Sequence, residues 1–248
     1  MLAIIGGSGL TQLSSLEVTR RQIVRTPYGE PSGALIFGRI GASEVVFLAR
    51  HGHDHRFPPH RVNYRANLWA LRSLGVRQVL GPCAVGGLRP HLGPGTVVVP
   101  DQVVDRTWGR EHTYYDVVGG VVHVSFADPY CAAGRSAVAQ ALDSAEAAAI
   151  PRHLGGTLVV VNGPRFSSRA ESLWHQSQGW DIVGMTAMPE AGLARELGLD
   201  YACLAIVANW AAGAGPDPDE VITLQDVLAN VAAAMDGAAR ILRAMLGG

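Results

Sequence analysis

Residues 62–80 read VNYRANLWALRSLGVRQVL, and this stretch decides the fold class. In its first part, residues 62–74, large apolar side chains recur every three or four positions, which predicts a helix with one buried face. Gly75 follows as a stop signal, because glycine readily adopts the backbone conformation that ends helices. The next residues, 76–80, predict a buried strand. A helix that leads directly into a buried strand is typical of α/β proteins.

The same alternation continues along the chain. Short apolar runs bounded by glycine or proline predict further strands at residues 1–5, 35–37, 45–49, 96–99, 156–161, 182–184 and 201–208. Helical spacing predicts helices over residues 131–149, 169–178 and 187–197, and over the last segment from Thr223. The sequence therefore predicts an α/β fold: a single domain of residues 1–248, with a central mixed β-sheet flanked by helices.

The composition narrows the class of partner and compartment. The net charge is −1 and like charges form no block, so nothing indicates nucleic acid or an anionic membrane as a partner. The three cysteines form neither a disulfide framework nor a zinc pattern, which favours free thiols in a reducing compartment. The N-terminus lacks the features of a signal peptide, and no apolar run could span a bilayer. We therefore expect a cytoplasmic protein.

Segments of unusual composition follow the predicted strands, where α/β proteins bind ligands. These segments cover residues 6–9, 50–53, 83–87, 162–166, 185–186 and 209–210. The glycine-rich loop GGSG would let backbone N–H groups and the Ser8 hydroxyl approach an anion, although a tight structural turn explains it equally well. Arg50 and His51 match the donor pattern that phosphate requires, with an ordinary salt bridge as the alternative for Arg50. We expect these loops to meet at one edge of the sheet.

Two other functions remain open at this point. The segment HGHDH, residues 51–55, is one residue short of the histidine spacing of binuclear metallohydrolases, and the other histidines add no ligand pattern. We therefore predict no metal site, with a metal-dependent hydrolase as the alternative. A nucleotide-binding module without catalytic activity is the third possibility.

Six segments, in this order, resemble the family of trimeric purine nucleoside phosphorylases and 5′-methylthioadenosine phosphorylases. They are IIGGSGL at 4–10, LARHG at 48–52, VNYRAN at 62–67, DQVVDRT at 101–107, GPRFSSRAE at 163–171 and GMTAMPE at 184–190. The resemblance implies an α/β fold with a mixed sheet, a homotrimer that can pair into a dimer of trimers, and a role in purine salvage. It also implies the reaction: a purine nucleoside and inorganic phosphate give the free base and a ribose 1-phosphate, without a cofactor.

The resemblance also implies which residues act. Phosphate would be held by Ser8, Arg50, His51, Thr186 and the backbone at Cys83 and Ala84. Base and ribose would be contacted by Phe166, Met185, Asn209, Trp210 and Ala211. Arg50, His51 and Asn209 would carry the catalysis. The thiol of Cys83 stands where the family usually has a threonine, so one hydroxyl donor to phosphate is missing.

The segment ANWA, residues 208–211, replaces the Thr-Asp-x-Asp of the methylthioadenosine enzymes. The Asn209 amide can donate to N7 or O6 of a 6-oxopurine, whereas no acid remains to accept from a 6-amino group. Ser167 stands where enzymes for ordinary nucleosides carry a glutamate. This pattern favours 6-oxopurine nucleosides, with methylthioadenosine as the alternative.

The resemblance also implies that Leu224, Val227 and Leu228 lie near the 5′ position of the nucleoside. An apolar wall favours a methylthio group over a hydroxyl, although these side chains would also suit the protein core. Together with Asn209, they point to S-methyl-5′-thioinosine as the substrate, with inosine and guanosine as weaker ones.

Overall fold

The computed structural model describes residues 1–7, 10, 15–217 and 224–247, without the side chains of residues 224, 226–228 and 232–235. Its strands are β1 (Leu2–Gly6), β2 (Glu17–Gln22), β3 (Leu35–Ile40), β4 (Ser43–Ala49), β5 (Gln78–Gly87), β6 (Val97–Val99), β7 (Gln102–Arg106), β8 (Arg152–Leu154), β9 (Thr157–Val161), β10 (Ile182–Gly184) and β11 (Asp200–Trp210). Its α-helices are α1 (Tyr64–Ser73), α2 (Ala132–Leu142), α3 (Arg169–Ser177), α4 (Ala187–Glu196) and α5 (Leu224–Leu246). A short 3₁₀ turn, Pro59–Arg61, precedes α1.

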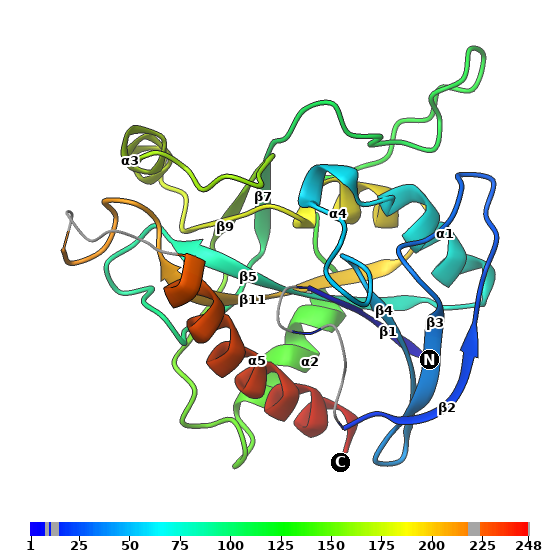
Figure 1. Ribbon diagram of the computed structural model, residues 1–248, viewed down its shortest axis with the longest axis horizontal. Coiled ribbons are helices and arrows are strands. Elements are labelled where there is room, and N and C mark those ends of the chain that lie inside the picture. The colour runs from blue at the N-terminus through cyan, green and yellow to red at the C-terminus, as the bar shows by residue number, and fades with distance from the viewer. Residues whose placement is uncertain (8–9, 11–14, 218–223, 248) are drawn as a thin grey trace.

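The sheet is mixed, as the sequence predicted. Its main path runs β2-β3-β4-β1-β5-β10-β9-β7, and β11 joins β5 to β6 and, through β6, to β8. Strands β1, β4, β5 and β11 pair in parallel, whereas β10 runs antiparallel to β5. The long strands β5 and β11 lie side by side through the middle of the molecule (Figure 1).

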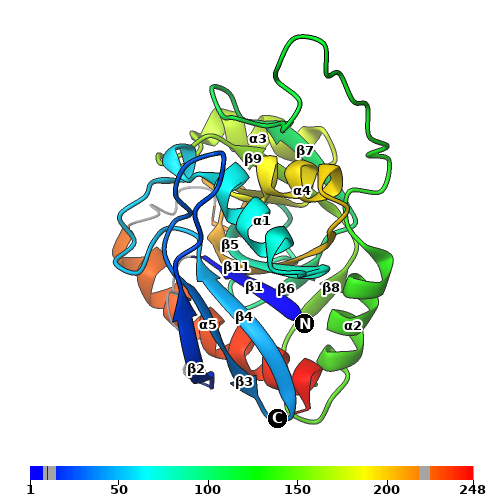
Figure 2. The ribbon, with the colours of Figure 1, turned by 90° about the vertical axis from the view of Figure 1, so that its right-hand side faces the viewer.

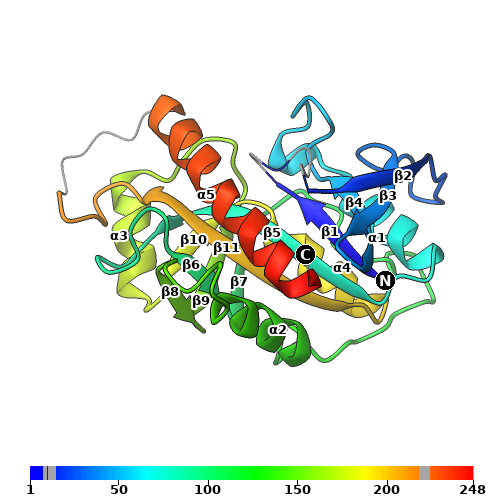
Figure 3. The same cartoon turned by 90° about the horizontal axis from the view of Figure 1, so that it is seen from below.

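Helices cover both faces of this sheet. Helices α1 and α4 pack together on one face, and α2 and α5 pack together on the other (Figures 1 and 3). Neighbouring residues of one strand therefore enter different cores: Ile5 packs with the α1 and α4 side, and Ile4 with the α2 and α5 side. A strand buried on both faces reads as a continuous apolar run, which is why the sequence revealed β1 and β11 so clearly.

The predicted helix at 131–149 is too long. Helix α2 ends at Leu142, and the N–H groups of Asp143 and Ser144 donate to carbonyls three residues back, a tightening that ends the helix. Strand β5 extends beyond its predicted end at residue 80, up to Gly87. Strand β2 escaped prediction because it is polar and exposed, as edge strands usually are. None of the helices in the described ranges is long and apolar enough to cross a membrane.

Candidate active site

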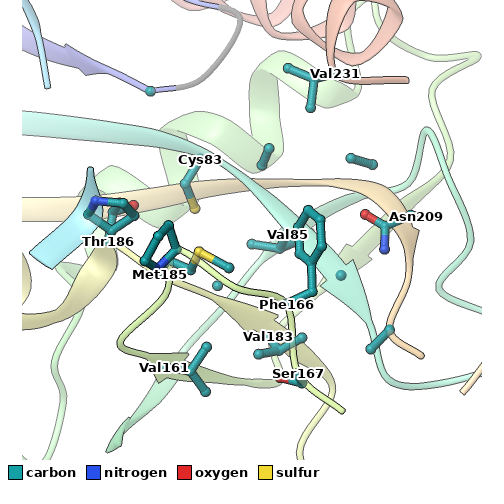
Figure 4. A pocket seen from close by; sticks show the side chains of 18 of the residues that line it. Cys83, Val85, Val161, Phe166, Ser167, Val183, Met185, Thr186, Asn209 and Val231 are labelled. Atoms are coloured by element: carbon teal, nitrogen blue, oxygen red, sulfur yellow. The ribbon is translucent and has the colours of Figure 1, made fainter. Parts of the chain in front are cut away.

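One cavity of about 440 Å³ lies where strands β1, β4, β9, β10 and β11 end, beside the second half of β5 and the start of α4. Its walls contain ten of the residues singled out from the sequence: Arg50, His51, Cys83, Ala84, Phe166, Ser167, Met185, Thr186, Asn209 and Ala211. Figure 4 shows Cys83 and Thr186 near one end of this cavity, and Phe166 and Asn209 near the other. The expected meeting of the strand-end loops is confirmed.

Arg50 follows β4 and is almost fully buried, with 1% of its surface exposed. Its guanidinium forms two parallel bonds of 2.8 Å to the Glu190 carboxylate, and Nη1 donates to the Pro82 carbonyl at 3.0 Å. Burial alone would lower the pKa of Arg50, but the adjacent Glu190 carboxylate raises it above its ordinary value. A Cβ at Gly7 would lie 2.8 Å from Arg50 Nη1, so the guanidinium needs the glycine of the first loop. Arg50 is therefore a permanent cation in a fixed orientation.

The imidazole of His51 is also buried and lines the cavity. Its Nδ1 lies 2.8 Å from the carbonyl oxygen of Phe57, and a carbonyl can only accept, so Nδ1 carries the proton. Burial and the nearby Arg50 lower the pKa of His51 to about 4. At neutral pH the ring is therefore uncharged, and its Nε2 is a hydrogen-bond acceptor.

Thr186 occupies the N-cap position of α4, and its side chain makes no capping hydrogen bond. The Thr186 hydroxyl therefore remains free to donate to a ligand in the cavity, and the non-helical backbone of Met188 interrupts the helix two residues later. Cys83 and Ala84 line the cavity from β5. The Cys83 sulfur lies 3.6 Å from that of Cys203, and this contact, with Arg50 nearby, lowers the pKa of the Cys83 thiol.

The loop before α3 carries Phe166 and Ser167 into the cavity. A capping box fixes its end: the Ser168 side chain accepts from the Glu171 N–H, and the Glu171 carboxylate accepts from the Ser168 N–H at 2.7 Å. Arg165 adds a two-bond ion pair to Glu171, with both distances 2.8 Å. These bonds lower the pKa of Glu171 to about 2, so it stays ionised. Phe166 thus projects from an ordered loop, although 42% of its surface is exposed.

Asn209 lies near the end of β11, and its amide nitrogen donates to the Trp210 carbonyl at 2.6 Å. This contact fixes the orientation of the amide, because a carbonyl accepts only from the nitrogen side. One N–H and the oxygen of the Asn209 amide remain for a ligand. Ala211 adds only a methyl group to the same wall.

Trp210 does not belong to the cavity wall. Its indole packs against Gly93 and Gly215, where a Cβ at either position would press on the ring. A β-bulge at the end of β11 breaks the regular alternation there: Ala208, Asn209 and Ala211 line the cavity, and Trp210 turns away. Of the remaining predicted residues, Ser8 lies outside the described residues, as do the side chains of Leu224, Val227 and Leu228.

Several wall residues were given no role in phosphate or nucleoside binding from the sequence, namely His55, Pro59, Val85, Val161, Val183 and Val231. The valines come from strands β5, β9 and β10 and from α5, where an apolar side chain usually signals core. Val231 lies four residues beyond Val227, hence on the same face of α5. The pattern of α5 could therefore have revealed it as part of the expected apolar wall.

Among the described side chains, no group of three or more His, Cys, Asp or Glu residues could hold a metal ion.

The chain is similar along most of its length to several known phosphorylases. The chain is 54% identical over 242 residues to a purine nucleoside phosphorylase of Streptomyces coelicolor, covering 95% of this chain and 84% of the relative. It is 55% identical over 214 residues to an S-methyl-5′-thioadenosine phosphorylase of Mycolicibacterium smegmatis, covering 86% and 78%. It is 47% identical over 237 residues to a probable S-methyl-5′-thioinosine phosphorylase of Xanthomonas campestris, covering 95% and 93%.

A solved structure of methylthioadenosine phosphorylase from Schistosoma mansoni, with adenine bound, superposes with a TM-score of 0.92 at 38% identity. The alignment covers 99% of this chain and 90% of that one, so the two folds agree almost throughout. The sequence model of the phosphorylase superfamily matches residues 1–247. With this match along its whole length, the chain belongs to the phosphorylase superfamily.

Proposed function

We propose that this protein cleaves the glycosidic bond of a purine nucleoside with inorganic phosphate, giving the free base and a ribose 1-phosphate. The observation that supports the proposal is that the two ends of the cavity carry different chemical groups. Thr186 lies with Cys83 at one end, and Asn209 and Phe166 offer an amide and an aromatic ring at the other (Figure 4). Arg50, which donates to the carbonyl of Pro82 beside Cys83, and His51 add donors and an acceptor to the first end. The sugar of a nucleoside would lie between a phosphate and a base held in this way.

The phosphate end suits the attacking reactant. Three of the five guanidinium N–H groups of Arg50 donate to described residues, which leaves two for phosphate oxygens. His51, neutral and protonated on Nδ1, would accept a hydrogen bond through Nε2 from the protonated oxygen of hydrogen phosphate. An unprotonated phosphate oxygen then faces C1′. Fixing both reactants in this way removes much of the entropic cost of their encounter.

In the reaction, a phosphate oxygen forms a bond to C1′ while the bond from C1′ to the purine nitrogen breaks. The bonding electron pair moves onto the purine, which later takes up a proton. The remaining N–H of Asn209 would donate to N7 or O6 as this charge develops. Asn209 therefore acts on the leaving group, whereas Arg50 and His51 act on the nucleophile.

The base end favours 6-oxopurines. The free N–H of Asn209 can donate to N7 or O6 of a 6-oxopurine, Ala211 offers no polar side-chain group, and the Asn209 oxygen is the one acceptor that these two residues leave for a 6-amino group. The apolar wall that includes Val231 favours a methylthio group over a hydroxyl at the 5′ position. The substrate that combines both features is S-methyl-5′-thioinosine, and inosine and guanosine are weaker substrates. The relatives named for methylthioadenosine make that nucleoside the second candidate.

The chain works as one phosphorylase domain within a homotrimer, which can pair into a dimer of trimers, in the cytoplasm. A loop between β7 and α2 supports the assembly, since it extends from the body of the molecule (Figure 2). Its exposed apolar side chains are Trp108, Tyr115, Val117, Val118, Val121, Val122 and Val124. Such a cluster on a projecting loop is typical of a surface that a partner subunit covers.

The test is release of base from methylthioinosine, methylthioadenosine, inosine and adenosine, each with and without phosphate. Release that requires phosphate and is fastest for methylthioinosine supports the reaction and the assignment of Asn209. Preference for methylthioadenosine would keep the phosphorylase and reject the base assignment. Release that is independent of phosphate would identify a hydrolase and reject the phosphate site.

A further inference from the structure

Behind the phosphate end of the cavity lies a buried polar cluster of Arg50, Glu190 and Tyr201. Their exposed fractions are 1%, 0% and 2%. Only Arg50 reaches the cavity wall; Glu190 and Tyr201 lie behind it. Buried polar groups destabilise a fold unless their hydrogen bonds are complete, so a cluster of this kind is retained where it fixes a geometry.

Glu190 fixes the plane of the Arg50 guanidinium. Its two oxygens accept from Nε and Nη2 at 2.8 Å each, and the Pro82 carbonyl accepts from Nη1. A planar fork bound at two points cannot rotate about its axis. Glu190 is carried by α4, whose N-cap Thr186 also lines the cavity. Thr186 and Glu190 thus lie four residues apart in the chain, on either side of the non-helical backbone at Met188.

Tyr201 in turn fixes the carboxylate. Its hydroxyl donates to Glu190 Oε1 at 2.7 Å, the same oxygen that accepts from Arg50 Nη2. Burial, with the carboxylate of Glu190 nearby, raises the pKa of Tyr201 well above its ordinary value, so the hydroxyl keeps its proton and remains a donor. Tyr201 lies on β11, the strand that also carries Asn209.

The hydroxyl fits because residue 81 is glycine. A Cβ at Gly81 would overlap the Tyr201 hydroxyl and lie 3.1 Å from Glu190 Oε1. Glycine at position 81 therefore leaves the space that the Tyr201 hydroxyl occupies.

We infer that Glu190 and Tyr201 are positioning residues for phosphate: they hold the Arg50 guanidinium so that its two remaining N–H groups face the oxygens of the nucleophile. This inference rests on the proposed phosphate site. Neither residue touches the reactants. Their effect should therefore appear in the use of phosphate and leave the binding of the nucleoside unchanged.

Replacing Tyr201 with phenylalanine removes one oxygen and keeps the ring in the core. Tyr130→Phe is the matched control: Tyr130 is 3% exposed, its ring stacks on Tyr201 with centroids 6.1 Å apart, and its hydroxyl has no partner among the described residues. Steady-state kinetics with phosphate varied, and then with nucleoside varied, separate the two binding steps. We expect Tyr201→Phe to raise the KM for phosphate roughly tenfold, the order for one lost hydrogen bond to a charged group. The KM for nucleoside should stay within about twofold, and Tyr130→Phe should change neither constant by more than that.

A merely structural role gives a different result. Tyr201→Phe would then lower the melting temperature and the amount of active enzyme but leave the KM for phosphate at its original value, which would overturn the inference. Calorimetric titration of Glu190→Gln with inorganic phosphate gives a second measure. A glutamine can accept from only one of the two Arg50 donors, so phosphate binding should weaken further than in Tyr201→Phe, and unchanged binding by a folded Glu190→Gln protein would also overturn the inference.

An assay of the wild-type protein distinguishes failure of this inference from failure of the proposed function on which it rests. If the wild type releases base without phosphate, the proposed function fails, and the positioning role fails with it. If the wild type requires phosphate and Tyr201→Phe does not alter the KM for phosphate, only the positioning role fails.

Discussion

The Nδ1 atom of His51 lies 2.8 Å from the carbonyl oxygen of Phe57, and this contact settles which nitrogen of the ring is protonated. The protein thereby holds a neutral histidine next to a permanent guanidinium. Two consequences can be measured, one in stability and one in catalysis.

The stability of the fold should depend on pH through His51. The unfolded ring takes up a proton below its ordinary pKa of 6.5, whereas the folded ring does so only near 4. Because the unfolded state binds more protons in this window, His51 destabilises the fold increasingly as pH falls from 6.5 to 4 and has no such effect above it. Urea unfolding of the wild type and of His51→Gln, measured at several pH values, should show a shallower loss of stability in the variant. Parallel curves would contradict the assignment.

In catalysis, His51 should not titrate between pH 5 and 8, because its pKa lies near 4. Replacing His51 with alanine removes the acceptor for the protonated phosphate oxygen. We expect the KM for phosphate to rise by roughly tenfold. Sulfate carries no proton between pH 5 and 8, so it should inhibit the wild type only weakly. Strong inhibition by sulfate would show that Nε2 of His51 does not act as an acceptor.

Asn209 should decide which base is released. Substitution by aspartate restores an acid and should shift preference from 6-oxopurine toward 6-aminopurine nucleosides. Substitution by alanine removes the donor to the leaving group and should lower kcat by about 10²-fold, as for other lost transition-state donors. The ratio of kcat/KM for methylthioinosine and methylthioadenosine measures the first effect. An unchanged ratio in Asn209→Asp would reject the role of this residue in base recognition.

The ion pair between Arg165 and Glu171 should matter through Phe166. Glu171→Ala removes both the capping box and the Arg165 contact, so the loop that carries Phe166 should become less ordered. The KM for nucleoside should rise a few fold with no change in the KM for phosphate. Glu146→Ala, which removes a longer surface contact of 3.9 Å to Arg243, is the control and should change neither. A rise in the phosphate KM alone would place Glu171 in a different role.

The valines of the loop between β7 and α2 should hold the subunits together. Val118 is fully exposed in the single chain, so a charge there leaves the fold of the subunit intact but disrupts an apolar contact between subunits. Sedimentation of Val118→Asp should show smaller particles than the wild type, for which we propose a trimer. A wild type that sediments as a monomer would refute the assembly itself.

The sequence predicted which residues come together better than it predicted the contacts between them. Arg50, His51, Thr186 and Asn209 meet because strands of one sheet end at one edge, a rule that needs no coordinates. The ion pair of Arg50 with Glu190 joins residues 140 positions apart, and no local pattern encodes such a pairing. The polar edge strand β2 was missed for the related reason that its residues lack the apolar signal on which strand prediction depends.

Trp210 shows where a motif misleads. A resemblance transfers a whole segment, but a strand turns alternate side chains to opposite faces. The register of β11 against β5 shifts between Val207 and Asn209, and this bulge decides which of residues 208–211 face the cavity. Ala208, Asn209 and Ala211 line it and Trp210 does not. Bulges depend on pairing with a neighbouring strand, so the sequence of β11 alone could not reveal this one.

The pairing of Arg50 with Glu190 also determines how the protein attracts its anion. Because the carboxylate already neutralises the guanidinium and His51 is uncharged, the phosphate end has little net charge to draw ions from a distance. Long-range electrostatic attraction, which is weakened by salt in solution, therefore contributes little to the binding of phosphate. Selection takes place at contact range, through the number and direction of hydrogen bonds. An anion of equal charge but different shape gains nothing from the field of this site.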